Sequence, residues 1–483
     1  MGYEELKINQ EEMIEGLLKV LKCKSEEAAP VKTKDGELLP FGQGVHDAFT
    51  ATLDLARDMG FTVCNCDNYG GHIDFEGTGE DGKEPKIFGI IGHLDVVPAG
   101  TGWDFDPYCG EVKDGYILGR GTTDDKGPVI SCLYVMKAMK DAGLKPKNTI
   151  RLILGLDEET HWKGIEYYFS KVRKPDYGFT PDAEFPVINA EKGLIIFDLS
   201  KKFRKTNEKG LMIRSIKGGT APNAVPAECR AVLYNENEKD GYEDIKAEIE
   251  RFRIDTGYKV NYRVMGKSIE VTTTGKAAHG AMPYLGLNAI SIMMKLLTRL
   301  YVKNEGQAEF IDFYENHIGF DLNGKGLKMD LSDEPSGDMI FNVGMIDCDT
   351  EQATLKINCR YPVTKTVDEV YAGVPAIIEK YDMGIVKLEE KPPIFLDVDN
   401  PMVKTLLAAY QKQSGDYESK PLVIGGGTYA KACENVVAYG ALFPGDPDLM
   451  HQKNECLSVE RFLQFTEIYK EAIYKLANEE YTE

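Results

Sequence analysis

Residues 86–97 read KIFGIIGHLDVV, an apolar strand pattern with a histidine and an aspartate near its end. A helical pattern follows at residues 128–142, and a second apolar strand at residues 149–156 leads directly into Asp157-Glu158-Glu159. This order of strand, helix and strand predicts an α/β domain with a central, mostly parallel sheet. Because ligands gather beyond the carboxyl ends of such strands, the polar residues there are the first candidates for chemistry.

The α/β pattern stops near residue 194 and resumes near residue 394. At 483 residues the chain is also too long for one ordinary core. We expect a discontinuous α/β domain at residues 1–193 and 394–483, and an inserted α+β domain at residues 194–393 that is large enough for two modules. The other expected elements are helices at 13–22, 45–56, 287–301 and 459–476, and β-rich segments at 268–274, 339–360 and 436–443.

The net charge of −21 and the ten scattered cysteines limit the class of protein and its compartment. Nucleic-acid binding relies on clustered Lys and Arg, so the charge argues against such a partner. The longest apolar runs, such as residues 87–91, are far shorter than a membrane span, and no secretory leader opens the sequence. Only Cys64 and Cys66 lie close together, too close for an ordinary disulfide, so we expect reduced thiols and a cytoplasmic location.

His93 lies at the end of the first apolar strand, two residues before Asp95. Residues i and i+2 point to the same face of a strand, so the two side chains can touch. A carboxylate bonded to one ring nitrogen fixes the tautomer and aims the other nitrogen at a metal. The pair alone is more typical of a packed core histidine, so its meaning depends on the acids around it.

A glycine-rich loop, GRGTTDDKG at residues 119–127, opens the next predicted helix with two adjacent acids. A phosphate loop is the competing interpretation, but the order Gly-x-x-x-x-Gly-Lys-Ser/Thr is absent and the acids would repel phosphate. A carboxylate held on such a tight turn suits a metal, and its two oxygens can bridge two metals.

More acids and a second histidine follow other strand signals. Glu158 and Glu159 diverge in extended backbone, so one can bind a metal while the other reaches the water on that metal. Asp182 and His451 each follow an apolar approach. Each acid alone is more typical of a solvated surface, but together these residues predict a metal site. Two histidines with carboxylates suit Zn²⁺, and oxygen-rich sites also accept Mn²⁺ or Co²⁺.

The remaining histidines give weaker signals. His161 follows the glutamate pair but points into the start of the next helix, and His46, His72 and His317 are expected to be surface or packing residues. His279 is different, because it lies in a small-residue turn of the inserted region that could present its ring to a cleft.

These motifs, in this order, resemble the dinuclear metallopeptidase family that includes aminoacylase, carboxypeptidase G and the carnosinases. Within that family the likeness is greatest to bacterial dipeptidases of the PepV type. The resemblance implies hydrolysis of the amide bond of dipeptides or similarly small peptides through a water that bridges two metals. The matching segments are GHLDVVP at 92–98, residues 119–127, DEET at 157–160, FTPDAE at 179–184, GGGTY at 425–429 and HQKNE at 451–455.

The resemblance also implies a role for each matching residue. Asp124 would bridge two divalent metal ions. His93 and Asp182 would complete one site, and Glu159 and His451 would complete the other.

The same family pattern assigns the residues around the metals. Glu158 would be the general base, Asp95 would orient the first histidine, and His279 would stabilise the oxyanion from the inserted lid. Asn223, in GTAPN, and Arg360, in NCRYP, would bind the substrate, with the arginine pairing with its free carboxylate.

The insert of about 200 residues resembles the family type in which a second lid module mimics a dimer partner. This likeness implies a monomer whose closed lid leaves room for little more than a dipeptide. Two alternatives remain at this point: an N-acyl amino acid deacylase of the same family, and a non-catalytic peptide-binding protein on the same fold. The second is disfavoured because Glu158 and all five expected metal ligands are present.

Overall fold

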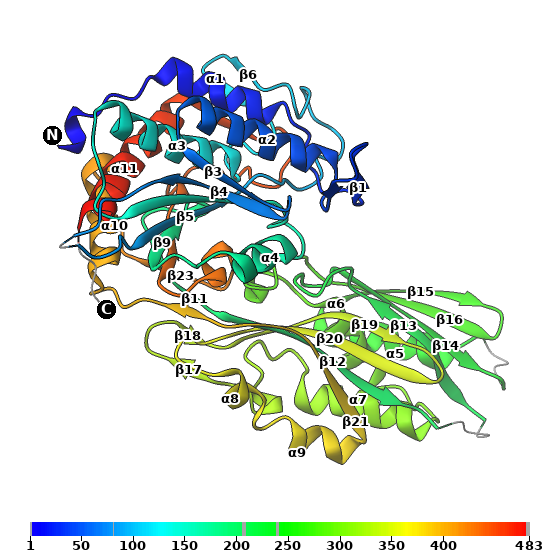
Figure 1. Ribbon diagram of the computed structural model, residues 1–483. Coiled ribbons are helices and arrows are strands. Elements are labelled where there is room, and N and C mark those ends of the chain that lie inside the picture. The colour runs from blue at the N-terminus through cyan, green and yellow to red at the C-terminus, as the bar shows by residue number, and fades with distance from the viewer. Residues whose placement is uncertain (1, 81, 205–208, 238–240, 480–483) are drawn as a thin grey trace. The chain divides into compact units, whose positions relative to one another are not determined.

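The computed structural model describes residues 2–80, 82–204, 209–237 and 241–479, which belong to two compact units (Figure 1). Unit 1 comprises Met1–Ala190, Ile394–Val423 and Gly427–Glu483. Unit 2 comprises Glu191–Pro393 and Ile424–Gly426. The α/β segments at the two ends of the chain therefore form one unit, and the segment between them forms the other.

Among the described residues of unit 1, nine strands form a mixed sheet. Its middle strands β24, β9, β5 and β8 are parallel neighbours, and strands on both sides pair antiparallel with them. This arrangement confirms the predicted α/β class. In spatial order the strands are β22 (Ile394–Phe395), β11 (Ile188–Glu191), β24 (Val436–Ala438), β9 (Tyr177–Thr180), β5 (Ile87–His93), β8 (Thr149–Gly155), β4 (Gly70–Phe75) and β3 (Thr62–Cys66), with β23 (Leu422–Ile424) paired to β11.

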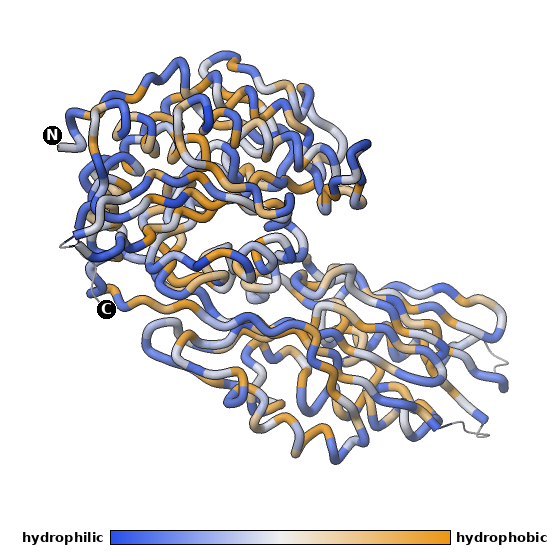
Figure 2. Tube along the Cα trace, in the orientation of Figure 1, coloured by the Kyte–Doolittle hydropathy of each residue, from blue (hydrophilic) through white to orange (hydrophobic). Residues whose placement is uncertain are grey.

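Both faces of this sheet are covered, which explains why its central strands are apolar throughout. Ile90 and Leu152 belong to the large core on one face, whereas Ile91 and Ile153 pack on the opposite face. Figures 1 and 2 show the helices around these strands and the hydrophobic residues along them. The helices of the large core are α1 (Gln10–Leu21), α2 (Gln43–Asp58), α3 (Lys126–Asp141), α10 (Pro401–Ser414) and α11 (Val459–Asn478), and α4 (Lys163–Lys171) covers the other face.

Two predicted strands of unit 1 are shorter than expected. The strand predicted at 86–97 ends at His93, because the chain then leaves the sheet and Val96 N–H donates to the carbonyl of Ser25 instead. The segment predicted at 436–443 is divided into β24 and β25 (Ala441–Leu442) at Gly440, whose φ is 74°. The first break follows from a contact between segments that are distant in sequence, and the second from one backbone angle. The hydrophobic pattern of the sequence continues through both breaks and therefore does not reveal them.

In the described part of unit 2, eight antiparallel strands form one sheet. Two groups of four strands meet where β13 pairs with β19. Helices pack on one face of this sheet with a second, separate core. In spatial order the strands are β15 (Lys259–Met265), β16 (Ser268–Thr274), β14 (Glu228–Asn235), β13 (Leu211–Gly218), β19 (Ile340–Cys348), β20 (Gln352–Tyr361), β12 (Gly193–Lys202) and β21 (Met383–Lys391), and the helices are α5 (Glu243–Thr256), α6 (Ala289–Leu297), α7 (Glu305–His317), α8 (Val367–Tyr371) and α9 (Pro375–Ile378).

The β-rich segment predicted at residues 339–360 is a hairpin of β19 and β20. At its turn the carboxylate of Asp349 accepts hydrogen bonds from the backbone of Glu351 and Gln352, which explains the break. Along β20, Leu355, Ile357 and Cys359 belong to the core of unit 2. Because side chains alternate along a strand, Asn358 and Arg360 lie together on the opposite face. The shorter strands of the chain are β1 (Val31–Lys32), β2 (Leu38–Leu39), β6 (Glu111–Lys113), β7 (Tyr116–Leu118), β10 (Ala183–Glu184), β17 (Ser332–Asp333), β18 (Gly337–Asp338) and β26 (Cys456–Ser458).

None of the helices in the described ranges is both long and apolar enough to cross a membrane. All ten cysteines lie in those ranges and carry free thiols. His72 has more contacts than the sequence suggested, because it is buried in β4 with Nδ1 2.8 Å from the hydroxyl of Tyr168. Burial, and then the nearby charge of Arg151, lowers the pKa of His72 to about 4.

The low pKa of His72 predicts a loss of stability in mild acid. The ring has a pKa of about 6.5 in an unfolded chain, so between roughly pH 6.5 and pH 4 the unfolded state binds the extra proton. The free energy of unfolding should therefore fall as the pH falls through this window, by on the order of 3 kcal/mol from this group. Urea unfolding at pH 7 and pH 4.5 should show a smaller decline for His72→Asn than for wild type. An equal decline in both proteins would contradict this explanation.

Candidate metal centre

The predicted metal ligands lie at the end of a strand or on loops beside the elements of unit 1. His93 ends β5, Glu159 follows β8 and Asp182 follows β9, so three of them stand at the carboxyl ends of parallel strands. Asp124 lies on the glycine-rich loop two residues before α3, and His451 lies between β25 and β26. The structure brings all five side chains together, although they are spread over more than 350 residues of sequence.

The first group joins His93, Asp124 and Asp182. The Nε2 atom of His93 lies 2.9 Å from Oδ1 of Asp124 and 3.5 Å from Oδ2 of Asp182. Its Nδ1 lies 3.0 Å from the backbone carbonyl of Asp95, to which it can only donate. In that tautomer the lone pair of Nε2 faces two carboxylate oxygens, so a proton or a bound cation has to lie between them. Burial opposes a charged ring, but the carboxylates of Asp124, Asp182 and Asp95 outweigh it and raise the pKa of His93 well above its usual value.

The second group joins Asp124 to Glu159 and His451. The Nε2 atom of His451 lies 2.9 Å from Oδ2 of Asp124 and 3.0 Å from Oε1 of Glu159. Hydrogen bonds from the ring to these two carboxylates raise the pKa of His451 to about 11. Each oxygen of Asp124 therefore faces a different histidine, and each histidine has a second carboxylate beside it.

This donor set fits two divalent cations. Within each group the candidate ligand atoms all lie within 4.8 Å of one another. Zinc binds nitrogen and oxygen ligands at about 2.1 Å, so neighbouring ligands of a tetrahedral site lie about 3.4 Å apart, close to the separations in both groups. Imidazole with carboxylates also accepts Mn²⁺ and Co²⁺.

Glu158 and Asp95 lie beside these groups without belonging to either. Burial, and then the charge of Asp182, raises the pKa of Glu158 well above its usual value. The carboxylate of Asp95 accepts a hydrogen bond from the backbone N–H of Glu159 at 3.0 Å, and its other oxygen lies 3.4 Å from Nδ1 of His93. The ring of His93 is therefore closer to the backbone carbonyl of Asp95 than to the carboxylate of Asp95. Through these contacts Asp95 positions both the ring of His93 and the backbone of Glu159.

Sequence reasoning assigned no role to Asp125, Glu455 or Arg120. Asp125 accepts a hydrogen bond from the backbone N–H of His93 at 3.1 Å. Glu455 is fully buried and accepts hydrogen bonds from Arg120 at 2.7 Å and from backbone N–H groups of the glycine-rich loop at 3.1 Å. This glutamate thereby ties the loop of Asp124 to the segment of His451. Its place in the HQKNE motif was the available signal, but the partners lie more than 330 residues away.

Replacing Arg120 with methionine should lower both stability and metal affinity. The change leaves Glu455 as a buried charge without its cation, which typically costs about 3–5 kcal/mol. Urea unfolding measures the first effect, and titration of the metal against a competing chelator measures the second. The double variant Arg120→Met with Glu455→Gln should recover part of the lost stability, because no buried charge remains unpaired. A double variant as unstable as the sum of its two single variants would contradict the coupling.

The other three predicted site residues lie in unit 2, where two loops bring them near one another. The backbone N–H of Gly280 donates to the carbonyl of Asn223 at 2.7 Å, and Ala224 pairs with His279 as a β-bridge. Burial, and then the charge of Arg360, lowers the pKa of His279. Unit 2 therefore groups an exposed amide, an imidazole and a buried guanidinium.

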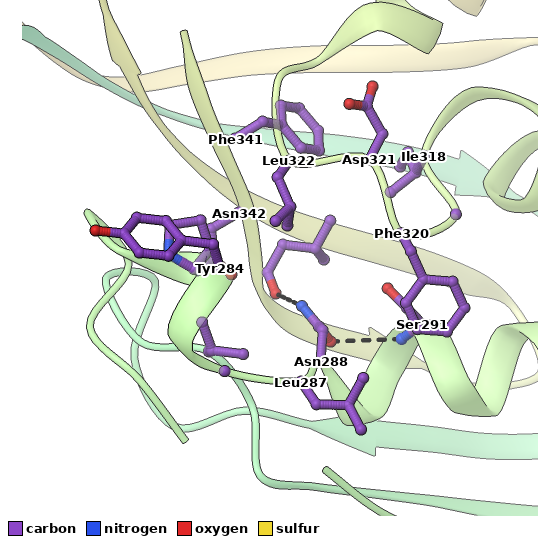
Figure 3. A pocket seen from close by; sticks show the side chains of 15 residues that line it. Tyr284, Leu287, Asn288, Ser291, Ile318, Phe320, Asp321, Leu322, Phe341 and Asn342 are labelled. Carbon is purple, nitrogen blue, oxygen red and sulfur yellow. Dashed lines mark hydrogen bonds between the residues drawn. The ribbon is translucent and has the colours of Figure 1, made fainter. Parts of the chain in front are cut away.

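Unit 2 also contains a cavity of about 240 Å³ (Figure 3). Asn288 lines it, but its amide donates to the carbonyl of Val343 and accepts from the backbone of Ile290 and Ser291. Because the chain itself satisfies this polar group, the cavity gives no evidence of a ligand comparable to that of the two groups of candidate metal ligands.

The sequence and the fold can be compared with those of known proteins. The family model described as "Peptidase family M20/M25/M40" matches residues 89–475. The chain belongs to this peptidase family. A putative dipeptidase of Bacillus subtilis strain 168, YtjP, is 35% identical over 451 residues, which cover 92% of this chain and 94% of the relative. A putative dipeptidase of Staphylococcus aureus strain MW2 is 36% identical over 483 residues, with 99% and 98% covered.

Solved structures share the M20 fold at lower identity. Aminoacylhistidine dipeptidase from Vibrio alginolyticus matches with a TM-score of 0.57 and 15% identity over 99% of both chains. An M20 metallo-carboxypeptidase from Sulfolobus solfataricus matches with a TM-score of 0.55 and 14% identity, over 96% of this chain and 98% of the other. These likenesses agree with an α/β domain and an inserted lid.

Proposed function

We propose that this member of the M20/M25/M40 family is a metal-dependent dipeptidase with two divalent cations per chain. The observation that best supports this function is the position of Asp124, which presents one oxygen to His93 and the other to His451 at 2.9 Å each. The relatives named putative dipeptidases, alike over nearly the whole chain, support the substrate class. Zn²⁺ is the proposed metal, with Mn²⁺ or Co²⁺ as alternatives, and the proposed form is a cytoplasmic monomer.

The proposed reaction gives each side chain one task. Two bound cations would polarise the scissile carbonyl and lower the pKa of water. Glu158 accepts the proton of the attacking water and passes it to the leaving amine, because its carboxyl belongs to neither ligand group. His279 donates to the oxyanion, a contact often worth about 3 kcal/mol. Arg360 binds the free carboxylate of the substrate in a two-pronged pair, and Asn223 donates to the substrate beside it.

Metal removal followed by selective restoration tests this function. Protein treated with a chelator should lose hydrolysis of alanyl-alanine and regain it when about two equivalents of Zn²⁺ or Mn²⁺ are added. Alanyl-alanine should be cleaved faster than N-acetylalanine. The reverse order would favour a deacylase, and hydrolysis that survives metal removal would contradict the proposal.

A further inference from the structure

Asn358 is an unusual buried residue of unit 2. It lies on β20, two residues before Arg360 and on the same face, and it is 1% exposed. Among the described residues, neither its Nδ2 nor its Oδ1 has a hydrogen-bond partner. Buried polar groups in native proteins are nearly always paired, so an amide with both atoms unpaired needs an explanation.

Other amides of the same unit are satisfied by the chain. Asn342 lies directly opposite Asn358 in the register of β19 and β20, and its Nδ2 donates to the carbonyls of Pro222 and Ala224. Asn288 is also paired through both ends of its amide (Figure 3). The local backbone can therefore satisfy an amide whose role is structural, and Asn358 differs from its neighbour in this respect.

The group beside Asn358 is also unpaired. Arg360 is 6% exposed and its Nε has no partner. The charges of Glu389 and Glu191 act on it, but no acid of the described residues forms an ion pair with it. Gly425 lies over its stem, since a Cβ there would be 3.7 Å from Cγ of Arg360. A buried cation that lacks a close ion pair, next to a buried amide without a partner, is the donor set expected for a bound carboxylate.

We propose that Asn358 is a further substrate-binding residue that donates from Nδ2 to the same terminal carboxylate as Arg360. This inference rests on the proposed dipeptidase function and adds a determinant of specificity to it. A carboxylate accepts about four hydrogen bonds, and the fork of an arginine supplies two of them. A neutral amide adds a donor to the oxygens of the carboxylate without adding a second charge to the buried site, whereas the charge of Arg360 favours a free carboxyl terminus over a carboxamide.

The isosteric variant Asn358→Asp tests this role directly. Its carboxylate would oppose that of the substrate, so KM for alanyl-alanine should rise by about 30-fold or more, with kcat within about threefold. The same oxygen can accept a hydrogen bond from a carboxamide, so KM for alanyl-alanine amide should stay constant or fall. Equal changes for both substrates, or no change for either, would overturn the inference.

Thermal unfolding separates binding from a structural role. Asn358→Leu removes two unpaired polar atoms, so its Tm should equal or exceed that of wild type while KM for alanyl-alanine rises. The matched variant Asn342→Leu removes two real hydrogen bonds and should lower Tm. A lower Tm for Asn358→Leu with unchanged KM would overturn the inference. Wild-type hydrolysis of alanyl-alanine is measured first: if it is absent, the proposed function fails as well, and if it is present, only the role of Asn358 is at stake.

Discussion

Replacing Glu158 with glutamine should remove nearly all turnover and leave two divalent ions bound per chain. The carboxyl of Glu158 lies outside both groups of candidate ligands, so its loss should not weaken metal binding. An amide cannot accept the proton of the attacking water, and general base catalysis contributes about 10²–10⁴-fold to such reactions. We therefore expect kcat to fall by about 10³-fold, with KM little changed.

Metal analysis and steady-state kinetics on the same preparation check this prediction. The matched control is Glu184→Gln, because Glu184 is an exposed acid in unit 1, two residues after Asp182. The control should retain wild-type kcat and metal content. A Glu158→Gln variant with kcat within tenfold of wild type would exclude this residue as the base, and loss of one ion would make it a ligand instead.

The acids and histidines at strand ends could be predicted from the sequence because the argument is local. An apolar run followed by His93, or by Glu158 and Glu159, places those residues at a sheet edge wherever the rest of the chain goes. The same reasoning gave the α/β class, which the structure and the family comparison confirm. This reasoning could not give the exact carboxyl end of β5, because that end depends on the hydrogen bond from Val96 N–H to the carbonyl of Ser25.

The missing parts of the site depend on contacts between distant segments. Glu455 and Arg120 are 335 residues apart, and neither has a periodic or spacing signal that would pair them. Asn358 is singled out by its lack of a hydrogen-bond partner, which only the folded structure can show. The segment 339–360 is likewise divided into two strands by the turn at Asp349. The sequence is β-rich on both sides of that turn, so its composition does not reveal the division.

Replacing Arg360 with methionine should cost more activity on free dipeptides than any change at Asn358. Methionine keeps much of the apolar stem but removes the charge that pairs with the carboxylate. Losing one partner of a buried charge pair typically costs about 2–5 kcal/mol, so kcat/KM for alanyl-alanine should fall by on the order of 10²–10³-fold. Alanyl-alanine amide has no such charge, and its kcat/KM should fall far less. Equal losses on both substrates would remove the proposed role of Arg360.

Arg360→Lys and a double variant sharpen this test. Lysine keeps the charge but lacks the planar fork, so it should restore only part of the preference for a free carboxylate. If Arg360 and Asn358 donate to one carboxylate, their effects cannot be independent. Arg360→Met combined with Asn358→Leu should then lose less than the product of the single losses, since the carboxylate is already poorly held once the cation is gone. Strictly multiplicative losses would mean that the two residues contact different groups of the substrate.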